Sequence, residues 1–149
     1  KRLRIHSRLP VVIPSRINES FLRWATASRL RPIMVLHINH SNEIDDEVAD
    51  AIKRLLDAGL KVLNQTVLLK DINDSATTLN TLSERLFDCD VSPYYLHLLD
   101  PVQGASHFDI DPEQAGEIYR ELQAMLPGFL LPKLVREIPG ELSKTIIAP

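Results

Sequence analysis

The sequence has almost no cysteine, no excess of basic residues and no long apolar run. Cys89 is the single cysteine in 149 residues, which excludes an internal disulfide or a multi-cysteine metal site within this chain. A formal net charge of −3 gives no electrostatic case for nucleic acid or an anionic membrane as partner. No apolar run approaches the roughly 20 residues of a membrane span, and no signal peptide opens the chain. These absences favour a cytoplasmic protein.

Apolar segments with two different periods alternate along the chain, and 149 residues suffice for one domain with its own core. The strand candidates are residues 3–7, 33–39, 60–69, 91–99 and 130–138. The helix candidates begin at the predicted caps Asn18, Asn42, Asn73 or Asp74, and Asp111, which precedes Pro112. Gly59 is predicted to end the second helix. Pro10 and Pro14 flank a segment that is predicted to be a loop or irregular extension.

Strict alternation of strands and helices with short links predicts parallel β/α units over residues 1–128, followed by a tail over residues 129–149. No Gly-x-Gly-x-x-Gly follows a predicted strand, which argues against a dinucleotide-binding sheet. About four β/α units are too few to close an eight-stranded barrel. The predicted fold class is therefore α/β, as a partial parallel β/α barrel.

Polar residues recur where the predicted strands end. In a β/α barrel this edge carries the active site, so their repeated placement predicts a site there. The residues are His6, Ser7, His37, Asn39, His40, Gln65, His97 and Asp100.

Each of these positions also has a purely structural interpretation. His37 and Asn39 could hydrogen-bond their own loop, and the amides of residues 64–66 could pack against neighbouring backbone rather than meet a ligand. Asp100 could cap a turn or bind a substrate cation. Glu137 and Lys144 flank a predicted Pro139–Gly140 turn, where a lysine is usually solvated but could also form a Schiff base.

Five stretches of the chain resemble the lysine 2,3-aminomutase family, whose members are radical S-adenosylmethionine enzymes that use pyridoxal phosphate. The likeness runs from end to end in consistent order and covers the C-terminal half of those enzymes. The chain begins at Lys1, without an initiator methionine, as expected of a second half. The matching stretches are Ser7 to Ile17, His37 to Ile44, Asn64 to Asp74, Pro93 to Asp100 and Gly104 to Phe108.

The tail over residues 136–145 is similar to the subgroup that makes β-lysine for modification of translation elongation factor P, because other aminomutases have a glycine run before the lysine. The fold implied is the C-terminal part of a radical S-adenosylmethionine barrel. The activity implied is that of an isomerase, which converts L-lysine to β-lysine by radical migration of the amino group from C2 to C3.

The resemblance also implies roles for six residues. Lys144 would bind pyridoxal phosphate covalently and act in catalysis. Asp100 and Glu137 would hold the ε-ammonium of the substrate, with Glu137 standing where the family usually has an aspartate. The residues implied to lie near S-adenosylmethionine are His37, Asn39 and Gln65.

The chain departs from the family in one large respect. The three-cysteine motif that binds the [4Fe–4S] cluster is absent, and Cys89 cannot replace it. The arginine expected to bind the substrate carboxylate is absent too. The cluster ligands therefore lie outside this chain, no metal ligands are assigned within it, and the chain alone is expected to be inactive.

Two other interpretations remain open. One is a metal-dependent β/α-barrel hydrolase or lyase that uses His37, His97 and Asp100. The other is a non-catalytic, truncated folding unit. An N-terminal half absent from the sheet would leave the strand at residues 3–7 as an exposed edge, which predicts homo-oligomers or poor solubility.

Overall fold

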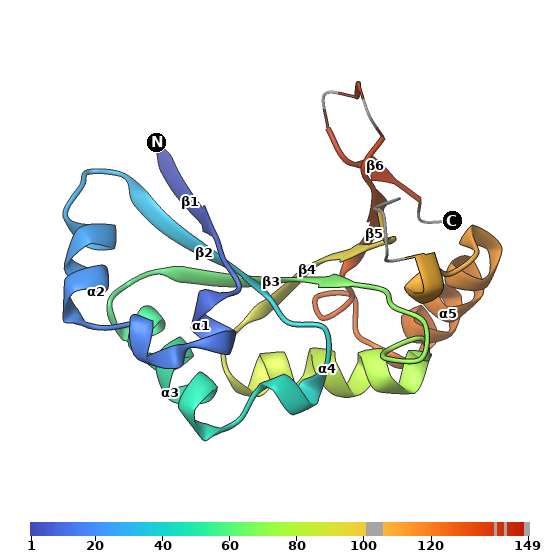
Figure 1. Cartoon of the computed structure of the whole chain (residues 1–149), viewed down its shortest axis with the longest axis horizontal. Coiled ribbons are helices and arrows are strands. Elements are labelled where there is room, and N and C mark those ends of the chain that lie inside the picture. The colour runs from blue at the N-terminus through green and yellow to red at the C-terminus, as the bar shows by residue number, and fades with distance from the viewer. Residues whose placement is uncertain (101–105, 139, 142, 148–149) are drawn as a thin grey trace.

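A single six-stranded sheet organises the molecule (Figure 1). The computed structural model describes residues 1–100, 106–138, 140, 141 and 143–147. Pro139 of the predicted turn, with Gly104 and Ala105 of the matching stretches, lies outside these residues. The strands lie in chain order as β1 (Arg2–His6), β2 (Arg31–His37), β3 (Lys61–Val67), β4 (Ser92–His97), β5 (Lys133–Arg136) and β6 (Thr145–Ile146).

Strands β1 to β5 are parallel, and β6 pairs antiparallel with β5. Between the strands lie α1 (Leu9–Val12), η1 (Pro14–Arg16), α2 (Glu19–Thr26), η2 (Ser41–Glu43), α3 (Asp46–Asp57), α4 (Ala76–Asp88), η3 (Ser106–Phe108) and α5 (Pro112–Met125). Helices α1, α3 and α4 lie on the same side of the sheet in Figure 1. The predicted fold class, a partial parallel β/α barrel, is confirmed. Strand β6 was not predicted.

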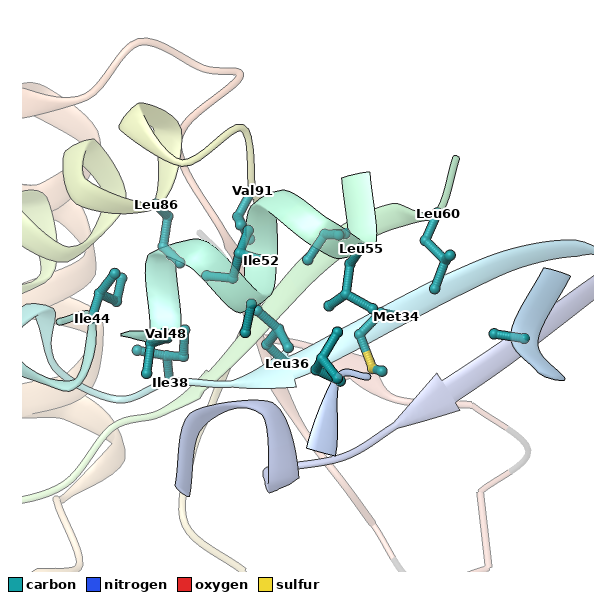
Figure 2. Packing of buried hydrophobic residues seen from close by; sticks show 14 of the residues in the cluster. Met34, Leu36, Ile38, Ile44, Val48, Ile52, Leu55, Leu60, Leu86 and Val91 are labelled. Atoms are coloured by element: carbon teal, nitrogen blue, oxygen red, sulfur yellow. The ribbon is translucent and has the colours of Figure 1, made fainter. Parts of the chain in front are cut away.

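A hydrophobic cluster fills the space between α3 and the helix-covered face of the sheet (Figure 2). Met34, Leu36 and Ile38 alternate along the β2 segment, so they share one face of it. Val48 and Ile52 follow the helical period of α3 and pack against them. A second cluster joins α5 to β4 and β5 through Leu122, Leu96 and Leu134. Within the described residues, the side chains on the opposite face of β2 to β5 belong to neither cluster.

The helix caps show where sequence patterns were sufficient and where they were not. Asn18 caps α2 by accepting from the backbone N–H of Phe21, and Asp111 caps α5, both as predicted. Gly59 has φ of +86° just after α3, the left-handed conformation that glycine tolerates at a helix end.

Three local predictions were wrong. Asp45, not Asn42, caps α3 by accepting from the N–H of Val48. Ser75, not Asn73 or Asp74, caps α4. The segment between the two prolines is partly helical, because Pro10 stands in the first turn of α1, where its missing N–H costs no hydrogen bond. Each error is a choice between neighbouring polar or proline positions, which local sequence does not resolve.

No helix in the described part of the chain is long and apolar enough to cross a membrane.

Strand β1 forms one edge of the sheet, and within the described ranges it pairs with β2 alone. A strand that is paired on one side only offers the free N–H and C=O groups of its other side to another chain. We expect the isolated chain to self-associate through this edge, with a sedimentation coefficient that rises with protein concentration. A constant monomer value across a wide concentration range would contradict the expectation.

Candidate functional site

Polar and aromatic side chains form a row across the sheet face that the helices leave uncovered. His37 on β2 lies opposite Gln65 on β3, and Gln65 lies opposite Tyr95 on β4. Residues paired across neighbouring strands project to the same face, so these three side chains share one surface. His97 stands two residues after Tyr95 and therefore projects to that face as well. His37, Gln65 and His97, three of the polar residues noted at the predicted strand ends, thus share one face of the sheet.

A cavity of about 570 Å³ lies over this row. The volume is within the range of small-molecule sites. The sheet contributes Arg4, His6, Gln65 and the Tyr94–Tyr95 pair to its lining, and the segment after β5 contributes Glu137, Ile138, Glu141, Ser143 and Lys144. Three of the predicted site residues, Gln65, Glu137 and Lys144, thus meet at one cavity. His37, Asn39 and Asp100 are not among its lining residues.

The pairing of β5 with β6 brings Lys144 to Glu137. Arg136 lies opposite Thr145 in the antiparallel pair, so the next residues outward are Glu137 and Lys144. The Nζ of Lys144 donates to Oε1 of Glu137 and forms an ion pair with it. The hydrogen bond and the charge of Lys144 lower the pKa of Glu137. Lys144 Nζ also lies 5.7 Å from the centre of the Tyr95 ring, within cation–π range.

A β-bulge turns two neighbouring tyrosines toward the cavity. Pro93 lies opposite Asn64 and Tyr95 opposite Gln65, so Tyr94 is the extra residue on β4. The two tyrosine rings lie against each other at an angle of 34°, with their centres 3.8 Å apart. Neither tyrosine was predicted as a site residue. Tyr95 could have been found from its position two residues before His97, but the bulge at Tyr94 has no sequence signal.

Three buried polar atoms on or near this face have no hydrogen-bond partner among the described residues: Nε2 of His37, Oε1 of Gln65 and Nε2 of His97. Buried polar groups in folded proteins almost always have a partner, so such atoms mark places where a ligand could bind.

Burial lowers the pKa of His37, with smaller contributions from the charges of His6 and Arg8. Burial also lowers the pKa of His97, and together with the charge of Lys144 brings it to about 4.

The pKa of His97 makes stability depend on pH. In the unfolded chain its imidazole titrates near 6.5, whereas in the folded chain it stays neutral down to a pKa of about 4. Below pH 6.5 the unfolded state therefore binds the extra proton, and folding stability is lost as pH falls from about 6.5 to about 4. We expect this group to contribute a loss of up to roughly 3 kcal/mol. Urea unfolding of wild type and His97→Gln across this range measures it. Parallel pH dependence in both proteins would contradict it.

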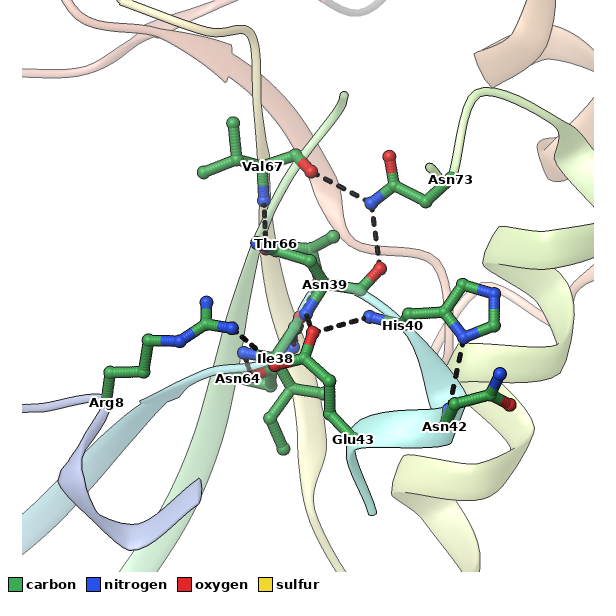
Figure 3. Close-up of polar contacts among 10 residues, drawn as sticks. All are labelled: Arg8, Ile38, Asn39, His40, Asn42, Glu43, Asn64, Thr66, Val67 and Asn73. Carbon is green, nitrogen blue, oxygen red and sulfur yellow. Dashed lines mark hydrogen bonds and ion pairs between the residues drawn. The ribbon is translucent and has the colours of Figure 1, made fainter. Parts of the chain in front are cut away.

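A network of side-chain amides ties the ends of β2 and β3 together (Figure 3). Oδ1 of Asn39 accepts from the N–H of Val67, and Nδ2 of Asn73 donates to the carbonyl oxygens of Asn39 and Val67. The sequence predicted a strand over residues 33–39, but β2 ends at His37, so Asn39 lies beyond the strand. The predicted role of Asn39 beside a cofactor stays a prediction, and part of its side chain is engaged in holding β3.

Asn64 and Thr66 are buried on the helix-covered side, where both bind the backbone of Ile38. Of the two interpretations open for residues 64–66, packing against backbone applies to these two, and only Gln65 lines the cavity. The alternation of side chains along β3 explains the difference.

The remaining predicted residues can also be placed. Asp100 is exposed, three residues after the end of β4, and its charge acts on His97. His40 caps η2, and Glu43 accepts from the backbone N–H of Asn39 and His40 while pairing with Arg8 at 2.7 Å. The described ranges contain no group of three or more His, Cys, Asp or Glu side chains that could hold a metal ion. His37, His97 and Asp100 therefore do not form the ligand set that the metal-dependent alternative needs.

Comparison with known proteins places this geometry in context. The chain is 54% identical over 145 residues to the L-lysine 2,3-aminomutase of Escherichia coli K12, which covers 97% of this chain and 42% of that protein. It is 53% identical over 148 residues to the L-lysine 2,3-aminomutase of Haemophilus influenzae, covering 99% of this chain and 44% of that protein. No family model matches.

Among solved structures, a radical SAM methyltransferase from Sphaerobacter thermophilus aligns with a TM-score of 0.53 and 18% identity, covering 78% of this chain and 37% of that one. The fold is thus part of a β/α barrel of the kind seen in that enzyme, open on a face that carries a polar cavity. By sequence, the chain is similar over nearly its whole length to proteins named L-lysine 2,3-aminomutase, as the resemblance predicted. It spans less than half the length of the curated relatives it matches.

Proposed function

We propose that this chain supplies part of the active site of an isomerase that converts L-lysine to β-lysine by moving an amino group from C2 to C3. The observation that carries the proposal is Lys144, a lysine amine beside Glu137 and the Tyr95 ring at a cavity of about 570 Å³. The identity of 54% to a relative named L-lysine 2,3-aminomutase supports the reaction and the substrate.

Pyridoxal phosphate fits the cavity residues. Its aldehyde needs a lysine amine, which Lys144 offers, and its flat ring suits a wall that contains Tyr95. When bound, the cofactor supplies an electron sink for the reaction. The residues of this chain would hold and orient it, and the Glu137 carboxylate would stay beside the amine.

S-adenosylmethionine fits the unpartnered polar atoms of His37 and Gln65, which need hydrogen-bonding groups from a ligand. When bound, it supplies the radical that starts the reaction. The [4Fe–4S] cluster has no fit within this chain, because Cys89 is its single cysteine and packs against the core under the helices. We assign its ligands to sequence outside this chain.

The substrate's ε-ammonium would be held by carboxylates. Glu137 already accepts from an ammonium group, that of Lys144, which supports its ability to bind a second one nearby. Asp100, exposed after the end of β4, would be the other carboxylate. Two carboxylates would neutralise the cation and orient the substrate.

The assignment to the subgroup that supplies β-lysine for elongation factor P rests on the tail over residues 136–145. This assignment predicts that β-lysine, the product of the reaction, is attached to elongation factor P in preference to lysine. Lysine and β-lysine have equal mass, so the factor and its ligase are incubated with an equimolar mixture of isotopically labelled L-lysine and unlabelled β-lysine, and the mass added to the factor tests the assignment. A factor carrying lysine instead of β-lysine would contradict it.

Turnover tests the proposed function. A form extended N-terminally to the length of its curated relatives is reconstituted with iron, sulfide, S-adenosylmethionine and pyridoxal phosphate under reducing, oxygen-free conditions. We expect β-lysine to accumulate from L-lysine, as followed by proton NMR, and no product from the Lys144→Ala variant. Consumption of S-adenosylmethionine without β-lysine would overturn the assignment of substrate.

A further inference from the structure

The cavity that contains Lys144 also contains an arginine to which neither the resemblance nor the proposed function gives a role. Arg4 lies in the middle of β1, two residues before His6, and both side chains line the cavity. Because side chains alternate along a strand, both project to the open face of β1, while Ile5 between them packs against the core under the helices. Lys144 directly precedes β6, so Arg4 and Lys144 line the same cavity from opposite edges of the sheet.

The charges in the cavity leave Arg4 as the cation that an anionic group would meet. Lys144 is paired with Glu137, and its amine is the group that would react with the aldehyde of the cofactor. His6 adds no fixed positive charge, because burial and the charge of Arg4 lower its pKa. The guanidinium of Arg4 is charged at any physiological pH, and it takes part in none of the ion pairs found in the described part of the chain.

Pyridoxal phosphate needs a partner at each of its two ends. Its aldehyde reacts with a lysine amine, whereas its phosphate is a strongly charged anion at neutral pH. The carboxylates of Glu137 and Glu141 also line the cavity and would repel a phosphate placed at the Lys144 end. A cofactor with its aldehyde at Lys144 and its ring along Tyr95 would instead extend its phosphate towards β1. There the planar fork of Arg4 could donate two parallel hydrogen bonds to the phosphate oxygens.

We propose that Arg4 binds the phosphate group of the pyridoxal phosphate held at Lys144. The proposal rests on the proposed function, since it needs the cofactor at that lysine. It makes Arg4 the residue that selects the phosphorylated cofactor over pyridoxal, which has the same ring and aldehyde but no phosphate.

The test measures the binding of two probes, pyridoxal phosphate and pyridoxal, to wild type and Arg4→Gln. The protein is the form extended N-terminally to the length of its curated relatives. The bound probe is reduced onto Lys144 with borohydride and quantified by peptide mass mapping at increasing probe concentration. Glutamine removes the charge, so we expect the affinity for pyridoxal phosphate to fall about 10-fold or more, the effect of losing a hydrogen bond between charged groups. The affinity for pyridoxal should stay unchanged, and Arg4→Lys should keep part of the affinity for pyridoxal phosphate.

Arg2 provides the matched control. It lies two residues before Arg4 on the same face of β1, is exposed, and is not among the residues that line the cavity. Arg2→Gln should leave both affinities unchanged. A fall for pyridoxal phosphate as large as in Arg4→Gln would overturn the proposal, because it would show a general effect of positive charge on β1.

Two further results would contradict a role for Arg4 at the phosphate. One is equal affinity of wild type and Arg4→Gln for pyridoxal phosphate. The other is an equal fall for both probes, which would mean that Arg4 supports the ring or the cavity wall. Absence of a wild-type adduct at Lys144 removes the proposed function and this proposal together, whereas a wild-type adduct that Arg4→Gln does not weaken removes only the role of Arg4.

Discussion

Replacement of Lys144 by alanine is expected to abolish the borohydride-stable adduct between this chain and pyridoxal phosphate. The aldehyde reacts with an unprotonated lysine amine, and Lys144 is the lysine that lines the cavity. Surface lysines react too, but weakly and without selection, because they are solvated and largely protonated at neutral pH. Reduction followed by peptide mass mapping should place the wild-type adduct on Lys144, with selective labelling reduced to background, about 100-fold, in the variant.

Lys53 provides the matched control. Like Lys144 it forms an ion pair with a carboxylate, that of Asp57 at 2.7 Å, but it is exposed on the outer surface of α3. Lys53→Ala should leave the adduct at Lys144 unchanged. Equal labelling of Lys53 and Lys144 would identify Lys144 as an ordinary loop lysine. If labelling then became selective in a form extended to the length of the relatives, the remaining sequence would be needed to complete the pocket.

The order of elements could be predicted from the sequence because its periodicities are strong. Val48, Ile52 and Leu55 repeat at helical spacing and are all buried in α3, and the apolar run before His37 forms a strand of the parallel sheet. Cap residues were predicted correctly where a single candidate stood at the boundary, as at Asn18 and Asp111. They were missed where two or three polar residues competed, as before α4.

The candidate site could be predicted only in part, because it depends on register. Strand ends indicated where polar residues gather, but not that Gln65 faces the cavity while Asn64 and Thr66 face the helices. A shift of one residue exchanges the two faces of a strand, and the sequence alone does not fix the register. The bulge that turns Tyr94 inward is a further change of register of this kind.

Lys144 and Glu137 show what resemblance adds to residue patterns. From the residue pattern alone, these two side chains could be either solvated surface groups or members of a catalytic site. The resemblance to the aminomutases selected them, and the antiparallel pairing of β6 with β5, absent from the predicted elements, brings them together. Short strands such as the two-residue β6 leave little trace in a sequence, because they are stabilised by tertiary contacts rather than by local propensity.

Replacement of Asn64 by leucine is expected to destabilise the folded chain by about 2–3 kcal/mol. Oδ1 of Asn64 accepts from the N–H of Ile38 at 2.9 Å, and its Nδ2 donates to the carbonyl oxygen of the same residue at 3.0 Å. Leucine has the same branched shape and the same number of side-chain heavy atoms, so the change removes hydrogen bonds without opening a cavity. The carbonyl oxygen of Ile38 keeps the hydroxyl of Thr66 as a donor, whereas its N–H is left buried and unpaired. The cost of that one N–H sets the expected magnitude.

Urea unfolding measures the loss, with Asn42→Ala as the matched control. The Asn42 side chain is exposed and outside the network, so its removal should change the free energy of unfolding by no more than about 0.5 kcal/mol. If the free energy of unfolding falls in Asn64→Leu by no more than in the control, water or a backbone shift must supply a partner for the Ile38 N–H.

The expected loss of stability has a functional consequence as well, because Ile38 is the residue between His37 and Asn39. An unanchored Ile38 would let both residues move, so weaker binding of S-adenosylmethionine should accompany the loss of stability.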